Sequence, residues 1–297
     1  MSKENDDHSK LWDAQSLDPE QLVVNTQSVA SLSREGVDEL YRLFNRYGVV
    51  IVEHAPADVP EQEMIALGKL FGEPVTHDRA DERGVVVIGE LSGYGEFVGA
   101  SSGPHLMHTG GTFMGWEDVP KVVLLQCEKQ SRIGGRSLLA SGAAAYRYMR
   151  RKSPRALEML RDPRVFSIRR TFDGAGKYGK TGVKGKAVFD DRRLGTGRIW
   201  MSFRFDGKIK LDIAPDEAHE VYDELVHFFD RSENQIDFKL KPNQILVCDN
   251  TSVVHSRTAY QAGSQRKLNR LQLDGSRDEL IFGFPEPPPE PTPEPPK

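Results

Sequence analysis

Short runs of alternating or wholly apolar residues recur along the chain, and they constrain its fold more than any other feature. The runs with the length and β-branched content of strands cover residues 49–53, 84–90, 121–127, 165–170, 198–206, 244–249 and 266–273. Segments of helical periodicity flank them, over residues 34–48, about 60–72 and from about 215 onward. Most of these strands lie in the later part of the sequence, and the helical segments lie between or before them. This order indicates a mainly β fold of the jelly-roll or barrel type with flanking helices.

Length and composition set the class of protein. The chain has 297 residues, 38% of them hydrophobic, and a net charge of −4, which is too small to indicate a nucleic-acid or membrane partner. No apolar run approaches the roughly 18 residues of a membrane span. The only cysteines, Cys127 and Cys248, lie in apolar runs, so we expect them in the core of a reduced, cytoplasmic protein.

Two segments depart from this pattern. Residues 285–297 are rich in proline and glutamate and predict a disordered tail behind a single domain of residues 1–284. Residues 172–197 are rich in glycine and lysine and predict a mobile insert over the mouth of the barrel. Between residues 151 and 198 there are fourteen Lys and Arg against five Asp and Glu, and this local excess favours an anionic partner.

Two of the eight histidines stand in informative surroundings. His108 opens the stretch "HTGGTF", and His255 follows the strand-like run "QILVCD" and a turn. A histidine followed two residues later by a carboxylate is a familiar iron-binding pair, but here that position is Gly110. The residues alone leave His108 as either a ligand or an ordinary loop histidine. We interpret the remaining histidines, including His105, as surface, loop or element-end residues.

Two arginines follow His255 on one strand. Arg266 and Arg270 point to the same face of residues 266–273, because side chains of a strand alternate with a period of two. An arginine in a core sheet is costly unless an anion meets it, and its planar fork suits a carboxylate. The alternative is that both arginines cover an exposed sheet face.

Two blocks of sequence resemble the iron(II)- and 2-oxoglutarate-dependent oxygenases of the taurine dioxygenase and clavaminate synthase group. They are residues 108–149, which contain "HTGGTF" and "GGRSLL", and residues 243–275, which contain "DNTSVVH" and "RKLNRLQL". The resemblance implies a double-stranded β-helix, the cupin-like jelly roll. It also implies an enzyme that uses Fe(II), 2-oxoglutarate and O₂ on a small molecule. The lysines of residues 172–197 favour a substrate that is anionic or tethered to an acidic carrier protein.

The resemblance also implies roles for particular residues. His108 matches the proximal iron ligand and His255 the distal one. Arg266 matches the arginine that pairs with the far carboxylate of 2-oxoglutarate, and Ser137 stands where the family has a hydroxyl donor to that carboxylate. Arg270 would face the same cavity and contact the cosubstrate or an anionic substrate.

Gly110 is where the sequence departs from the family, and three explanations compete. The favoured hypothesis is a halogenase: radical halogenases of the wider superfamily have Gly or Ala here, and chloride takes the vacated place on iron. A ferryl species would then abstract hydrogen from an unactivated carbon, and halogen would be transferred. The second is a hydroxylase or other oxidase with a two-histidine iron, completed by water or by Glu117 or Asp118. The third is a non-catalytic binding paralogue, and an engineered Asp-to-Gly change would look the same.

Overall fold

Most strands of the protein belong to two sheets that face each other. The computed structural model describes residues 10–75, 77–91, 98–170, 186–191, 197–205, 209–213 and 216–288. The six-stranded sheet has the order β1 (Val23–Thr26), β2 (Val49–His54), β12 (Gln244–Asp249), β5 (Val122–Lys129), β14 (Lys267–Leu273) and β3 (Val86–Ile88). The four-stranded sheet has the order β11 (Ile236–Phe238), β6 (Ser137–Ser141), β13 (Val253–Arg257) and β4 (His105–His108).

An apolar layer fills the space between these two sheets. Ile51, Cys248 and Leu268 enter it from the six-stranded sheet, while Leu139 and Val253 enter it from the four-stranded sheet. The strands of both sheets pair antiparallel except for β1, which pairs with β2 in parallel. Two largely antiparallel sheets packed face to face around one core form a jelly roll. The mainly β fold with flanking helices that the sequence predicts is therefore confirmed.

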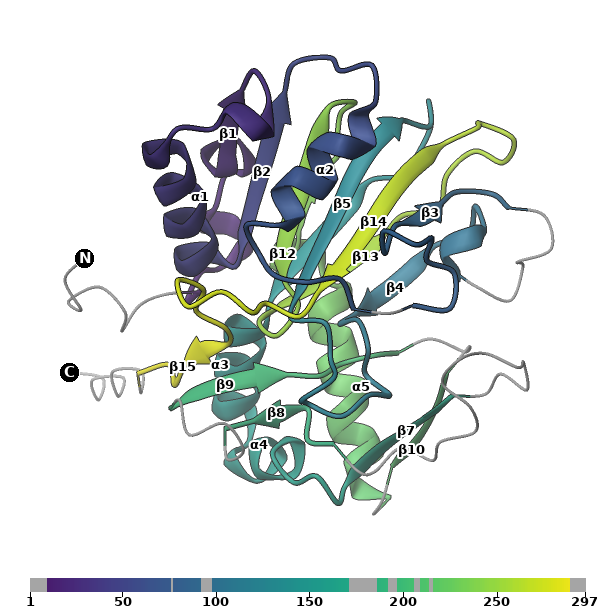
Figure 1. Cartoon of the computed structure of the whole chain (residues 1–297). Helices are drawn as coiled ribbons and strands as arrows, with labels where there is room; N and C mark the ends of the chain where they lie inside the picture. The colour runs from purple at the N-terminus through teal and green to yellow at the C-terminus, as the bar shows by residue number, and fades with distance from the viewer. Residues whose placement is uncertain are drawn as a thin grey trace, which may run out of the picture.

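In the part of the chain that the structure describes, five α-helices flank the sheets (Figure 1). The outer face of the six-stranded sheet packs against α1 (Arg34–Tyr47) and α2 (Pro60–Gly68). On the other side of the molecule, α3 (Gly142–Lys152), α4 (Pro154–Leu160) and α5 (Glu217–Asp230) pack against the four-stranded sheet. The sequence predicts α1, α2 and α5, although α2 ends earlier than expected; α3 and α4 are found only in the structure.

Local signals fix the ends of α1. The Ser33 hydroxyl accepts a hydrogen bond from the backbone N–H of Gly36 and so caps the first turn. Gly48 ends the helix with a φ of 70°, a left-handed conformation that glycine adopts without strain. The chain can therefore reverse at once into β2, the second strand of the six-stranded sheet.

Two smaller sheets lie beside α3 to α5. They consist of β7 (Phe166–Arg170) with β10 (Ile209–Ile213), and of β8 (Phe189–Asp190), β9 (Arg198–Met201) and β15 (Phe284–Pro285). The first residues of the predicted tail contact α3: Arg150 donates to the carbonyls of Pro287 and Pro288, and Tyr146 donates to Glu286. Residues 289–297 and most of the predicted insert at 172–197 lie outside the described residues.

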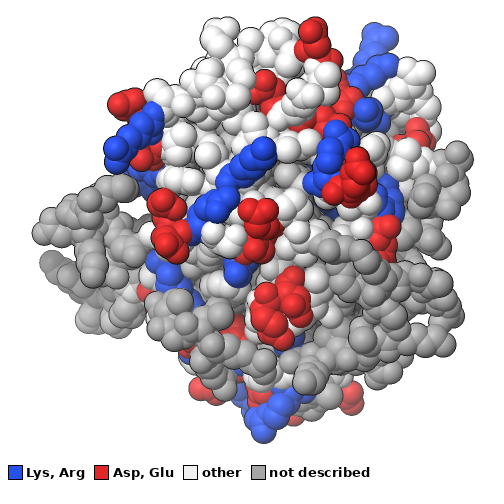
Figure 2. Space-filling view, viewed as in Figure 1, with Lys and Arg blue, Asp and Glu red and all other residues white. Residues whose placement is uncertain are grey.

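Charge is dispersed over the surface. On the face that Figure 2 shows, basic and acidic side chains of the described residues alternate without a large patch of one sign. This agrees with the small net charge of −4. Among the described residues, no helix has the length and apolar character needed to cross a membrane.

Candidate functional site

The turn between β12 and β13 connects the two main sheets and positions His255. Its polar side chains form a network of hydrogen bonds. Asp249, at the end of β12, is completely buried and accepts hydrogen bonds from the Thr251 and Ser252 hydroxyls, both at 2.6 Å. Lys10 adds a buried ion pair to Asp249 at 2.6 Å. A buried charge needs such partners, because an unpaired one costs several kcal/mol. The turn therefore has a fixed shape, and β13 begins in a fixed register.

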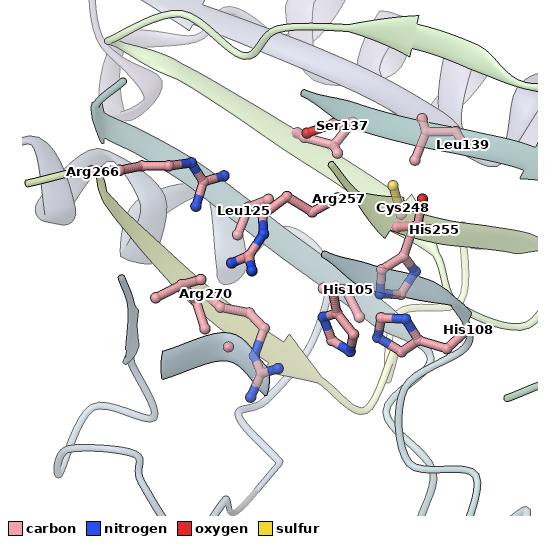
Figure 3. Close-up of a pocket in the computed structure, with 15 residues that line it drawn as sticks. His105, His108, Leu125, Ser137, Leu139, Cys248, His255, Arg257, Arg266 and Arg270 are labelled. Atoms are coloured by element: carbon pink, nitrogen blue, oxygen red, sulfur yellow. The ribbon is translucent and has the colours of Figure 1, made fainter. Parts of the chain in front are cut away.

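His108 and His255 are neighbours across two paired strands. His108 ends β4 and is paired directly with His255 of β13. Their ring centroids lie 4.4 Å apart. Both rings extend into a cavity between the two main sheets (Figure 3). The two histidines that the sequence singles out, 147 positions apart (255 − 108), thus meet at one place.

Both histidines are held neutral. Burial, together with the nearby Arg270 and Arg204 guanidiniums, lowers the pKa of His255 to about 4. Burial likewise holds the pKa of His108 well below its usual value, assisted by His105 and His255. The Nδ1–H of His108 donates to the Leu106 carbonyl at 2.8 Å, so the ring presents the lone pair of Nε2. Neutral imidazole nitrogens of this kind bind metal ions.

Arg266 and Ser137 line the same cavity as the histidines. Arg266 is buried, its guanidinium lies 5.0 Å from the centroid of the Tyr260 ring, and its Nη1 has no hydrogen-bond partner among the described residues. Burial lowers the pKa of Arg266, and the neighbouring Tyr260 offsets this only in part. Ser137, at the start of β6, is also buried beside the cavity. A buried guanidinium and a hydroxyl together fit a carboxylate.

Arg270 adds a second unpaired cation. Burial lowers its pKa to about 10, and Arg79 and Arg204 contribute by repulsion. Its Nε has no partner among the described residues. The sequence predicts that Arg266 and Arg270 share a face of a strand over residues 266–273. In the structure Arg266 directly precedes β14, and both arginines line this cavity.

The lining of the cavity is cationic. Three histidines and three arginines contribute to it, and no Asp or Glu is among its described lining residues. Such a cavity stabilises a dianion well, since each arginine offers charge and N–H donors that the protein leaves unused.

Gly110 lies just beyond β4, buried against the turn that follows β12. Its N–H donates to Asn250 Oδ1 at 2.6 Å, and its carbonyl accepts from Asn250 Nδ2 at 3.0 Å. A Cβ atom at this position would come within 3.0 Å of Gln272 Nε2 and 3.4 Å of Asn250 Oδ1. A side chain at position 110 would therefore lie against the side-chain amides of Gln272 and Asn250.

The carboxylates of Glu117 and Asp118, which could replace the missing iron ligand, are exposed. The Glu117 carboxylate lies against Gly115. Among the described residues, no three His, Cys, Asp or Glu side chains are placed so that together they could hold a metal ion. The chain thus presents two neutral imidazoles that fit iron, and no carboxylate beside them.

Sequence reasoning missed several residues of the cavity. His105 was assigned to a loop, but it is the first residue of β4 and lines the cavity. Arg257 also lines it, and Asn250 and Gln272 border Gly110. The even spacing of Arg270 and Gln272 on one strand could have revealed Gln272, whereas the position of His105 depends on an irregularity of pairing.

The amino-acid sequence is similar to those of a known family of dioxygenases. Residues 10–272 match the model of the family described as taurine catabolism dioxygenase TauD, TfdA family. The chain is 26% identical over 156 residues to the gamma-butyrobetaine dioxygenase of Homo sapiens, a match that covers 49% of this chain and 38% of the human protein. It is 25% identical over 166 residues to the FR-33289 synthase of Streptomyces rubellomurinus (strain ATCC 31215), covering 53% of this chain and 48% of the synthase. The matched stretches thus span less than half of these relatives.

Solved structures share the fold. An asparagine oxygenase in complex with Fe(II), 2S,3S-3-hydroxyasparagine and succinate superposes with a TM-score of 0.63 at 16% identity, covering 85% of this chain and 93% of that one. The non-heme iron oxygenase OrfP in complex with Fe, succinate and (3S)-hydroxy-L-Arg gives 0.62 at 14% identity, covering 86% and 88%. At these identities the likeness establishes the fold alone. The family match covers most of the chain, and the chain therefore belongs to the TauD/TfdA dioxygenase family.

Proposed function

We propose that the protein is an iron(II)- and 2-oxoglutarate-dependent oxygenase that hydroxylates a small anionic molecule. The observation that carries the proposal is the cationic cavity, in which two neutral histidines and two unpaired arginines meet without any carboxylate among the described lining residues. Family membership and the iron and succinate named for related structures support it.

The residues that line the cavity would bind the metal and the cosubstrate separately. His108, through Nε2, and His255 would hold iron, and iron so held would supply the activation of O₂. Arg266, through its unused Nη1, and the Ser137 hydroxyl would bind the far carboxylate of 2-oxoglutarate. With iron and 2-oxoglutarate bound, 2-oxoglutarate would supply the electrons and be converted to succinate and CO₂, one atom of O₂ entering succinate and the other entering the C–H bond of the substrate.

Arg270 would determine substrate specificity by binding an anionic group of the substrate. Its buried Nε has no hydrogen-bond partner among the described residues, and its side chain lines the same cavity as Arg266. A carboxylate, phosphate or sulfonate would satisfy it. Hydroxylated amino acids are named in the complexes of asparagine oxygenase and OrfP, and amino acids are therefore the first substrates to test.

Halogenation is the second candidate, and one feature favours it. Gly110 leaves the family's carboxylate position empty, and Gln272 Nε2 lies 3.0 Å from where a Cβ would be, as an N–H donor for a halide. The relatives named as dioxygenases and oxygenases support hydroxylation instead.

One assay separates the candidates. The anaerobically iron-loaded protein is mixed with 2-oxoglutarate, oxygen and an amino-acid library, with and without chloride, and products are read by mass spectrometry. Hydroxylation that is insensitive to chloride is expected. A product with the chlorine isotope pattern would establish halogenation, and absence of iron binding and of succinate would indicate a binding protein.

A further inference from the structure

Arg257 lines the same cavity, next to Ser137 and on the strand that carries His255. It is the last residue of β13 and is paired directly with Ser137 of β6. Directly paired residues of two antiparallel strands project to the same face, with Cβ atoms roughly 5 Å apart. His255, two positions earlier on β13, shares that face because side chains of a strand alternate. Arg257, Ser137 and His255 therefore reach the cavity from one sheet.

The guanidinium of Arg257 meets that of Arg266 from the opposite sheet. Arg257 belongs to the four-stranded sheet, whereas Arg266 directly precedes β14 of the six-stranded sheet. Both guanidinium carbons lie over the Tyr260 ring, at 4.9 Å from its centroid for Arg257 and 5.0 Å for Arg266. Figure 3 shows the two side chains directed into the same part of the cavity. Buried cations grouped in this way require an anion as partner.

Arg257 has hydrogen-bonding capacity that the protein does not use. It is buried, at 8% exposure, and its Nε has no hydrogen-bond partner among the described residues. Its Nη2 donates to the carbonyls of Ser101 and Gly103, which hold the side chain in place but carry no charge. No Asp or Glu is found among the described residues that line the cavity. The Nε–H and the positive charge of Arg257 are therefore available to a ligand.

Arg266 is also held in position before any ligand binds. A Cβ atom on Gly135 would lie 2.9 Å from Arg266 Nε, and Gly135 has a φ of +69°, so only glycine fits there without strain. The Arg266 side chain thus packs between the backbone of Gly135 and the ring of Tyr260, while its Nη1 has no partner among the described residues. Side chains ordered in advance lose less entropy when they bind a ligand.

We propose that Arg257 and Arg266 together bind the far carboxylate of 2-oxoglutarate, so that two guanidiniums from opposite sheets share one carboxylate. The proposal rests on the proposed function, because it concerns the same cosubstrate. A carboxylate offers about four lone-pair sites, which are enough for Arg257 Nε, Arg266 Nη1 and the Ser137 hydroxyl together. These donors belong to the protein alone, so the subsite should bind a dicarboxylate without any metal.

The subsite can be measured in the metal-free protein. The full chain is freed of metal with a chelator and titrated with glutarate, which has two carboxylates but no 2-oxo group that would chelate a metal. Calorimetry gives the Kd. We expect Arg257→Met to weaken glutarate binding by about tenfold or more, as Arg266→Met should, because each removes a charged donor.

A second titration separates ligand binding from a structural role of Arg257 at Ser101 and Gly103. 2-Oxopentanoate keeps the 2-oxo acid group that would bind the metal but lacks the far carboxylate. In Co(II)-loaded protein under anaerobic conditions, Arg257→Met should weaken 2-oxoglutarate binding by about tenfold or more and leave 2-oxopentanoate binding unchanged. Equal losses for the two acids would assign Arg257 to structure and overturn the proposal.

Arg136→Met is the matched control, because Arg136 precedes Ser137 and its side chain is 44% exposed. It should leave both titrations unchanged, and circular dichroism checks that every variant folds. Absence of glutarate binding to the unmodified protein, or unchanged glutarate affinity in Arg257→Met, would overturn the proposal; succinate formation in the substrate assay would then still support the proposed function. The expected losses without any succinate would instead reject the oxygenase function and keep the two-arginine site for a dicarboxylate.

Discussion

The side chain of Asn250 holds the backbone of Gly110 on both its hydrogen-bonding groups. Its Oδ1 accepts from the Gly110 N–H at 2.6 Å, and its Nδ2 donates to the Gly110 carbonyl at 3.0 Å and to the Pro120 carbonyl at 2.7 Å. Asn250 belongs to the turn after β12, and Gly110 follows β4. One amide thus ties the segment after His108 to the turn that precedes His255.

Replacing Asn250 should therefore disturb both histidines. In Asn250→Ala, buried backbone groups of Gly110 and Pro120 lose their partner, and we expect a loss of roughly 2–4 kcal/mol in the free energy of unfolding. Urea denaturation measures the loss, and Co(II) affinity should fall as well. Asn234→Ala is the control, because Asn234 makes one comparable bond to the Phe228 carbonyl. Equal effects of the two variants would argue against this role of Asn250.

The ion pair of Lys10 and Asp249 gives a second prediction. Both side chains are buried, at 1% and 0% exposure, with their charged atoms 2.6 Å apart. Removing one partner leaves a buried charge, so Asp249→Ala should destabilise the protein by about 3–5 kcal/mol. The double variant Lys10→Met/Asp249→Asn should lose less than Asp249→Ala in thermal unfolding at equal protein concentration. A larger loss in the double variant would contradict the argument.

Arg266 should not be replaceable by lysine. The planar guanidinium can hold a carboxylate by two parallel bonds, whereas an ammonium provides a point charge. We expect Arg266→Lys to raise the KM for 2-oxoglutarate by about tenfold or more, which corresponds to about 1.4 kcal/mol. Arg136→Lys, at an arginine whose side chain is 44% exposed, should leave this KM unchanged. Succinate formation measures both.

Gly110 can be tested by supplying the missing carboxylate. A Cβ at this position meets Gln272 Nε2 at 3.0 Å, so the variant Gly110→Asp is best made together with Gln272→Ala. Compared with Gln272→Ala alone, the double variant should bind Fe(II) more tightly, because an anionic oxygen is added near the cation. Any chlorinated product should disappear. Chlorination that persists in the double variant would place the halide elsewhere.

The two cysteines should be inert at neutral pH, as expected from their apolar surroundings. Burial raises the pKa of the Cys127 thiol to about 11 and raises the pKa of Cys248 as well. Neither thiol should react with a disulfide reagent at pH 8 until guanidinium unfolds the chain. The folded state holds the Cys127 proton above the ordinary thiol pKa of about 8.5, so its contribution to stability is full below that pH and is lost as pH rises through about 11. Fast labelling of the native protein would refute this.

Local patterns were sufficient for the main elements and for part of the site. The periodicity of residues 34–48 and the cap at Gly48 define α1, because the signals that start and end a helix are local. The same holds for β12 and β14, whose apolar and alternating runs are visible in the sequence. Arg266 and Arg270 could be assigned to one face because a strand has a fixed period of two.

The sequence by itself determined a mainly β fold with flanking helices and the candidate residues His108, His255, Ser137, Arg266 and Arg270. Tertiary structure decided what surrounds them, as His105 illustrates. Spacing alone would turn His105 away from His108, and only the bulge against β13 brings it into the cavity. Likewise, the contact of Gly110 with Asn250 joins residues 140 positions apart. Such pairings depend on how strands register across a sheet, and register is a property of two segments together, which neither segment encodes alone.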